Sequence, residues 1–197
     1  MALLGEQPGL RLVSGPAGAN NSTQYLAVVG YASLHGDQAE TIKVEVALRE
    51  PLLTAAGPHP AETLLLNPNS GGAIVPPLAV TSLSRQEAMA EKLRAALSRR
   101  EVAVRDFFDI DHAARHLGLR AGDTGLMELV SRKLAVPGNE PMDVSSSRLD
   151  ALRMQLASRL KPVLRERDFV EFDLERAFSL VADVAAAVAA RQPDRAR

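Results

Sequence analysis

The sequence predicts an α+β fold, with strands in the N-terminal half and helices in the C-terminal half. The N-terminal half holds two strand-like runs, Tyr25–Tyr31 and Ile42–Leu48, and the second run alternates apolar and polar residues. From Ser84 the apolar residues instead recur at helical spacing. We therefore expect a strand-rich part over residues 1–82, a helical part over 83–191 and a mobile tail at 192–197.

The N-terminal half begins with a segment rich in glycine and proline, so residues 1–22 are expected to be loop apart from a short strand at Leu10–Val13. The runs Tyr25–Tyr31 and Ile42–Leu48 are expected to pair as an antiparallel hairpin through a turn at His35-Gly36-Asp37. Gly30 is a candidate β-bulge. Two further apolar runs follow, at Thr63–Leu66 and Leu78–Val80.

The C-terminal half carries helix start and stop signals. Ser84 and Glu87 have the spacing of a capping box, which predicts a helix from Ser84 to about Arg99. A second helix is expected from about Val104 until Gly118 stops it. The remaining expected helices are Asp123–Leu134, Ser147–Arg165 with a kink or early end at Pro162, and Asp173 to about Arg191.

The composition excludes several classes of protein. Lys and Arg number 23 against 24 for Asp and Glu, so a globally basic nucleic-acid coat is excluded, although a local basic face is not. The absence of cysteine excludes disulfide scaffolds, thiolate nucleophiles and cysteine zinc sites. The N-terminus has neither the basic region nor the apolar run of a signal peptide or membrane span. We expect a soluble, cytoplasmic protein without a membrane partner.

Charged residues that could carry chemistry lie between Lys92 and Asp109. Asp106 and Asp109 are three residues apart, so their carboxylates are neighbours on a helix. Asp106 lies nearer the apolar stripe, where an acidic group needs a cationic partner such as Lys92, Arg99 or Arg105. Lys92 lies at the margin of its own apolar stripe, either as a structural lysine or as a phosphate ligand. The alternative for the two aspartates is a solvated helix face.

Three other groups leave alternatives open. Glu45 is either a solvated strand residue or a carboxylate that a rigid strand presents to a metal ion. Asp109, His112 and His116 have metal-compatible spacing, but histidines on an exposed face are usually only solvated. Arginine clusters near residues 94–105 and 148–165 are either a surface for an acidic partner or ordinary solvated helix faces.

The segment Ala90–Leu119 resembles the signature of the AbiEii family, nucleotidyltransferase-fold toxins that include the mycobacterial MenT type. The matching motifs are Glu91-Lys92-Leu93, an arginine at Arg99 or Arg100, and Arg105-Asp106 followed by Asp109-Ile110. The strand around Glu45 with the exit Arg49–Pro51, and Leu160–Leu164 with Phe169, are similar to other parts of the family pattern. The likeness covers about residues 25–175.

This resemblance implies a nucleotidyltransferase-like small mixed or antiparallel sheet and the transfer of a nucleoside monophosphate from an NTP. In toxins of this type the acceptor is the 3′ end of tRNA, so translation is blocked. The resemblance also implies Mg²⁺ or Mn²⁺ as the cofactor and a cognate antitoxin as a partner. Carried over residue by residue, it assigns Lys92, Asp106 and Asp109 to catalysis, Lys92, Arg99 and Arg100 to phosphate or tRNA contacts, and Glu45 and Asp106 to the metal.

One motif of the family is missing from this chain. A Gly-Ser turn followed by a D-x-D-like pair should precede the Tyr25 strand, but Glu6 is the only acidic residue there. Either the chain is short at its N-terminus, or Asp37 or Glu45 takes the place of that pair, or the metal site is incomplete. The last case leads to an alternative function, a catalytically incomplete nucleotidyltransferase-fold module that binds an antitoxin or a regulatory partner.

Overall fold

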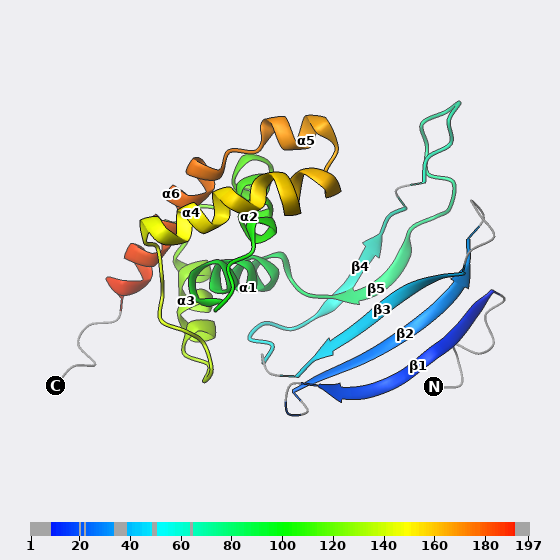
Figure 1. The fold of residues 1–197 in the computed structure, drawn as a ribbon, viewed down its shortest axis with the longest axis horizontal. Helices are drawn as coiled ribbons and strands as arrows, with labels where there is room; N and C mark the ends of the chain where they lie inside the picture. Colours follow the sequence, from blue (N-terminus) through cyan, green and yellow to red (C-terminus); the bar gives the residue numbers. More distant parts are fainter. Residues whose placement is uncertain are drawn as a thin grey trace. The chain divides into compact units, whose positions relative to one another are not determined.

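A computed structural model describes residues 9–19, 21, 23–33, 39–48, 51–63 and 65–191 of the chain. The fold is α+β, as predicted, with antiparallel sheets in the N-terminal half and helices in the C-terminal half (Figure 1). The change from strands to helices falls between Ser82 and Arg85. By compactness, however, the chain divides into a strand unit, Met1–Pro51, and a helical unit, Leu52–Arg197. The tail expected at 192–197 lies outside the described residues.

The strand unit is an antiparallel sheet in the order β1-β2-β3, formed by β1 (Leu10–Ala19), β2 (Gln24–Ala32) and β3 (Ala39–Ala47). The predicted pairing of the second and third strands is confirmed, with Leu26 opposite Glu45. The turn predicted at residues 35–37 lies outside the described part of the chain. The predicted loop is wrong for most of β1, which pairs with β2 as far as Ala19.

Gly30 is not a bulge, because it stays in regular register with both neighbouring strands. The irregularities lie in β1 instead, between Leu12 and Ser14 and between Ser14 and Ala17. They let β1 accommodate glycine and proline without losing its pairing. A Cβ atom at Gly30 would lie 2.9 Å from Cγ2 of Val13, so glycine leaves room here for the side chains of the neighbouring strand β1.

The helical unit begins with a two-stranded antiparallel sheet of β4 (Gly57–Ala61) and β5 (Leu78–Ser82). The predicted run Leu78–Val80 is confirmed as the start of β5. The sequence did not predict β4, which contains Pro58 and Pro60. A two-stranded sheet leaves an outer edge unpaired, where the missing N–H groups of prolines are tolerated. In the run Thr63–Leu66, Leu66 forms an isolated bridge to Ala73, and the described residues there form no longer strand.

Six α-helices follow, in the order α1 (Arg85–Ser98), α2 (Val104–His116), α3 (Thr124–Leu134), α4 (Ser146–Gln155), α5 (Glu166–Glu171) and α6 (Leu174–Ala189). The predicted start signals are confirmed for α1, α3 and α6, because Ser84, Asp123 and Asp173 each accept a hydrogen bond from a backbone N–H of the first turn. Gly118, with φ of 72°, follows α2 as predicted. The short helix α5 was not predicted.

The helix predicted over Ser147–Arg165 is correct only as far as Gln155. It continues as a π-helical turn, Leu156–Leu160, and a 3₁₀ turn, Lys161–Val163. Pro162 has no N–H to donate to the carbonyl of Ser158, and its ring would crowd that carbonyl in an α-helix. The backbone therefore leaves α-helical geometry before the proline.

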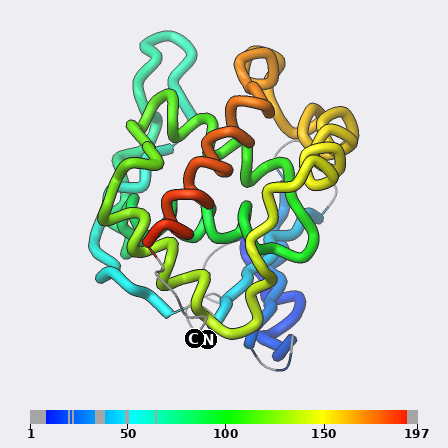
Figure 2. Tube along the Cα trace, turned by 90° about the vertical axis from the view of Figure 1, so that its left-hand side faces the viewer, coloured from blue at the N-terminus to red at the C-terminus, as the bar shows by residue number. Residues whose placement is uncertain are grey.

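One hydrophobic core holds the helices together, and Figure 2 shows α6 (orange to red) lying across α1–α3 (greens). Phe107 of α2 is fully buried and stacks on Phe178 of α6 with ring centroids 6.0 Å apart. Leu93 and Leu97 of α1 are also fully buried in this core. The core fixes α1 against α2, and the charged residues singled out in the sequence lie on these two helices. No helix in the described part of the chain has the length and apolarity to span a membrane.

Candidate functional site

Lys92 of α1 bridges the two aspartates of α2. Its Nζ lies 3.2 Å from Oδ1 of Asp106 and 2.7 Å from Oδ2 of Asp109. The helical spacing of the two aspartates places both carboxylates on the side of α2 that faces Lys92. The expectation that Asp106 needs a cationic partner is therefore confirmed. The alternative of two solvated aspartates is wrong for Asp106, which is buried, whereas the Asp109 side chain is 41% exposed.

Arg99, at the C-cap of α1, completes the cluster by donating from Nη1 to Oδ2 of Asp106 over 2.9 Å. Each oxygen of Asp106 thus faces a cation. The Asp106 side chain is only 3% exposed, whereas Lys92 and Arg99 are 35% and 36% exposed. A buried carboxylate therefore anchors two cations that still reach solvent. Lys92 and Arg99 together have more N–H donors than Asp106 and Asp109 engage, so they can bind phosphate oxygens.

The environment of Lys92 keeps it protonated. Partial burial disfavours its charge, but the hydrogen bond and charge of Asp109, together with those of Asp106, outweigh burial and raise the pKa of the Lys92 ammonium above its ordinary value. Lys92 is therefore suited to hold an anion rather than to act as a base.

The turn between α1 and α2, which carries Arg99 and Arg100, is held by two residues of α4. The buried Arg148 donates to the carbonyl oxygen of Ala96 over 2.9 Å and to that of Arg99 over 3.1 Å. Gln155 accepts from the N–H of Val104 and donates to the carbonyl of Val102. Sequence reasoning missed both roles, because each contact joins residues about fifty positions apart.

Arg148 carries its charge in a buried place. Burial lowers the pKa of the Arg148 guanidinium, and the nearby charge of Asp143 opposes that change. The guanidinium satisfies carbonyls at the C-terminal end of α1, where a cation is favourable. Arg148 thereby fixes the backbone from which Arg99 reaches Asp106.

A second charged network lies deeper in the helical unit, around Glu87 of α1. Glu87 is fully buried and lies 2.8 Å from Nζ of Lys133. Its carboxylate also accepts from the N–H groups of Leu53 and Thr54 and from the Thr54 hydroxyl. Burial disfavours the carboxylate, but these bonds outweigh it and lower the pKa of Glu87. The predicted capping box is thus half right: Ser84 caps the N–H of Glu87, while the Glu87 carboxylate turns to Lys133 and the chain before β4.

Glu45 is engaged within the strand unit. Its carboxylate pairs with Lys43 and accepts from Nε2 of Gln24 over 3.3 Å. Its predicted role at a metal stays a prediction. Asp37 and Arg49, which the sequence also singled out, lie outside the described residues.

The hypothesis of a zinc site at Asp109, His112 and His116 is wrong. The rings of His112 and His116 do lie close, with centroids 4.6 Å apart, but Asp109 is paired with Lys92. Among the residues that the structure describes, no three His, Asp or Glu side chains are placed to share a metal ion. Asp106 has a cation on each of its two oxygens, so its surroundings do not fit a magnesium ion.

Arg100 does not join the Lys92 cluster. Together with Arg99, it lines a pocket of about 820 Å³ in the helical unit. Arg105 and Arg159 line the same pocket. Of the arginines highlighted in the sequence, Arg94 and Arg153 instead pair with carboxylates within the unit.

Comparison with known proteins identifies the family of the chain. The family model described as "Nucleotidyl transferase AbiEii toxin, Type IV TA system" matches residues 9–189. Among solved structures, a candidate nucleotidyltransferase from H. pylori is 16% identical, with a TM-score of 0.44 over 93% of this chain and 69% of that one. JHP933 from Helicobacter pylori is also 16% identical, with a TM-score of 0.46 over 96% of this chain and 72% of that one. No curated protein matches the sequence.

Proposed function

Since the chain belongs to the AbiEii family of nucleotidyl transferase toxins of type IV toxin–antitoxin systems, we propose that it transfers a nucleoside monophosphate from an NTP to the 3′ end of tRNA. Translation then stops because the modified tRNA cannot be aminoacylated. The proposal places this action in the cytoplasm and includes a cognate antitoxin that opposes it. A MenT-like choice of tRNA as the acceptor is part of the proposal.

The observation that carries the proposal is the pair of cations on Asp106. In nucleotidyl transfer, the 3′ oxygen of the acceptor bonds to the α-phosphorus while the bond to pyrophosphate breaks, and negative charge grows on the leaving phosphates. Lys92 and Arg99 are assigned to those phosphates, because both are held by Asp106 and both reach solvent. Cations fixed beforehand stabilise the developing charge without reorganising.

Asp106 and Asp109 have different parts in this proposal. Asp106 is buried and acts by positioning Lys92 and Arg99, while the more exposed Asp109 holds Lys92 from the other side. Mg²⁺ or Mn²⁺ belongs to the proposal through the family, and would help to neutralise the triphosphate. Because the surroundings of Asp106 do not fit a metal ion, the part of Asp106 in this proposal is to position Lys92 and Arg99.

The test is incubation of the purified chain with total tRNA, magnesium and each α-labelled NTP in turn. We expect label on tRNA with at least one NTP, and none on tRNA whose 3′ end has been oxidised with periodate. Asp106→Asn, which keeps the size of the side chain, should lower the labelling rate by about a hundredfold, because Lys92 and Arg99 lose their shared anchor. Thermal unfolding of the variant checks that it is folded.

The same experiment separates the second candidate, a module without catalysis that binds an antitoxin or regulatory partner. Its support is that the sequence has no D-x-D-like pair before the Tyr25 strand. Absence of label with every NTP and with either metal would favour this module and contradict the transferase.

A further inference from the structure

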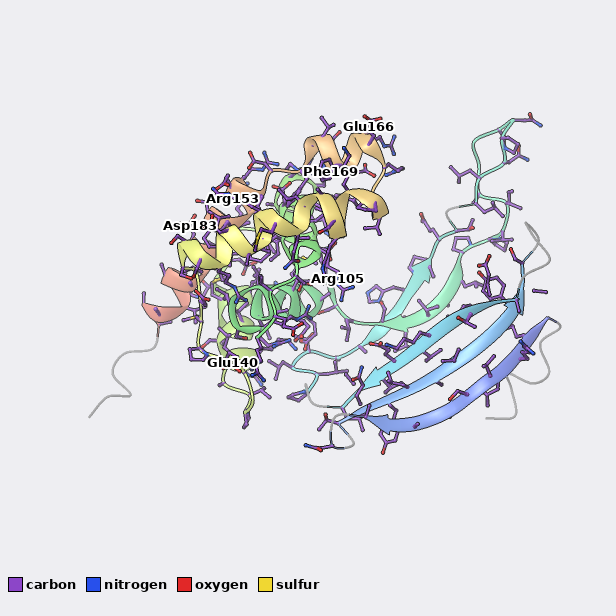
Figure 3. All side chains as sticks on the ribbon, in the orientation of Figure 1. Arg105, Glu140, Arg153, Glu166, Phe169 and Asp183 are labelled. Atoms are coloured by element: carbon purple, nitrogen blue, oxygen red, sulfur yellow. The ribbon has the colours of Figure 1, made fainter. Side chains whose placement is uncertain are left out.

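A pocket of about 820 Å³ lies in the helical unit where the α1–α2 turn meets α4 and the π-helical turn after it. Arginines dominate its charged lining: Arg99 and Arg100 come from the turn, Arg105 from the start of α2 and Arg159 from the π-helical turn. Glu101 is the one carboxylate among the lining residues. Figure 3 labels Arg105 at the start of α2. Four cations thus face one anion in a single hollow.

Arg99 is paired with Asp106, but the other three arginines of the lining have no such partner among the described residues. Other arginines of the helical unit are paired: Arg148 with Asp143 and Arg165 with Asp168, for example. By contrast, the described part of the chain offers no ion pair or hydrogen bond to the side chains of Arg100, Arg105 and Arg159, and all three are exposed. Unpaired guanidinium groups gathered around a hollow favour an external anion, and their planar forks match phosphate oxygens.

The rest of the lining indicates which anion. No aromatic side chain lines the pocket, so a base has no ring to stack on. The amide of Gln155 already holds the backbone of Val102 and Val104, which leaves it one free N–H to offer a base edge. The lining therefore suits the phosphates of a ligand rather than its bases. Because the arginines come from three separate segments, the pocket suits several phosphates along one strand more than a single nucleotide.

Arg99 connects this pocket to the Lys92 cluster. It lines the pocket and also donates to Asp106, which in turn faces Lys92. A strand lying in the pocket would therefore have its end beside the cations assigned to the NTP. This places acceptor and donor on either side of one arginine.

We propose that the pocket binds the phosphodiester backbone of the RNA acceptor close to its 3′ end, with Arg100, Arg105 and Arg159 as the phosphate contacts. The proposal rests on the proposed function for the choice of RNA. The affinity of the pocket for RNA, however, is measured without any transfer of nucleotide.

The test is fluorescence anisotropy with a labelled single-stranded RNA of about 12 nucleotides, in the absence of NTP, over a range of salt concentrations. The variant is Arg105→Gln/Arg159→Gln in the full chain. The matched control is Arg120→Gln/Arg132→Gln, which removes the same charge from two exposed arginines outside the pocket. All four side chains are exposed, so both variants should fold, and thermal unfolding checks this.

We expect the pocket variant to bind this RNA about tenfold more weakly than the control at low salt. Loss of two contacts should also reduce the slope of log affinity against log salt by about 1.4, since each phosphate contact on a single strand contributes about 0.7. Equal affinity and slope in the pocket and control variants would overturn the proposal. So would a wild-type chain that does not bind the RNA.

A second arm uses a fluorescent ATP analogue. If the pocket variant lost affinity for this analogue and kept its affinity for RNA, the pocket would be an NTP site and the proposal would be wrong. Failure of the proposed function gives a different result: the chain would bind RNA through the pocket but add no nucleotide. If only the pocket proposal fails, the wild-type chain still labels tRNA, and the pocket variant labels tRNA and binds RNA as well as the wild type does.

Discussion

The helical unit buries its apolar residues against one another, whereas the strand unit leaves most of its own exposed. Phe107, Leu93 and Leu97 have no exposed surface, while Ile42 and Val46 of β3 remain about half exposed. Among the described residues of the strand unit, Val29 is the one buried hydrophobic side chain. A three-stranded sheet in one layer has no second layer to make a core. The residues proposed for phosphate and RNA contacts all lie on the unit that has a core, which can hold them in fixed geometry.

The largest difference between the two units is expected when each is expressed alone and its unfolding is measured. Residues 52–197 expressed alone should unfold cooperatively in urea, because the whole hydrophobic core lies within them. Residues 1–51 alone should show no cooperative transition. Circular dichroism of the two fragments measures this. A cooperative transition in the strand fragment would show that the sheet carries its own stability and that the comparison is wrong.

The next largest difference is expected in the free energy of unfolding when one apolar side chain is truncated in each unit. Phe107→Ala should lower the free energy of unfolding by about 3–5 kcal/mol, since it leaves a cavity beside Phe178. Val44→Ala in β3 should cost less than about 1 kcal/mol, because Val44 is 41% exposed. Urea denaturation of the full chain compares the two. Similar costs would mean that the sheet face is buried in solution.

The buried ion pair between Glu87 and Lys133 is expected to contribute to the stability of the helical unit. Lys133→Met should cost about 3 kcal/mol, because it leaves the Glu87 carboxylate buried without its cation. The double variant Glu87→Gln/Lys133→Met should recover part of this loss, since no unpaired charge remains. If the double variant is less stable than the sum of the two single changes, the pair is not the source of the cost.

Acidification is expected to have a smaller effect on the free energy of unfolding. Because the pKa of Glu87 is lower in the folded chain than its ordinary 4.5, its contribution is complete above about pH 4.5 and declines as the pH falls through the folded value. Glu87→Gln should therefore weaken the fall in stability on acidification. Urea midpoints measured from pH 7 to pH 3 give the two slopes. Parallel slopes in wild type and variant would contradict the assignment.

The helices were predicted well because their signals are local. Ser84, Asp123, Asp173 and Gly118 each act within one turn of the helix they start or stop, so the sequence contains the whole signal. β1 and β4 were missed because glycine and proline argue against strands locally, and only pairing with β2 and β5 stabilises them. A partner strand is tertiary information that no short window contains.

The residues of the candidate site also divide into those that local sequence signals predict and those that only the fold brings together. The approach of Lys92 and Arg99 to Asp106 could be predicted as two of three possible pairings, because helical periodicity placed Lys92 and Asp106 at the margin of an apolar stripe. The contact of Lys92 with Asp109 was not predicted, since Asp109 lies farther round the helix. The role of Glu87 could not be predicted, since a capping-box pattern does not reveal a lysine on a third helix. Arg105 and Arg159 stood among many arginines in the sequence. Only the fold shows that these two line one pocket while Arg94 and Arg148 are paired elsewhere.

Lys92, held by Asp106 and Asp109, is proposed to bind the phosphates of the NTP during transfer to tRNA. The most direct measurement is the steady-state rate of transfer from the preferred NTP by wild type, Lys92→Met and the control Lys161→Met, with thermal unfolding of each. We expect Lys92→Met to lower kcat/KM by at least about a hundredfold, and Lys161→Met to stay within about twofold of wild type. A folded Lys92→Met chain that transfers nucleotide at the wild-type rate would contradict the role proposed for Lys92.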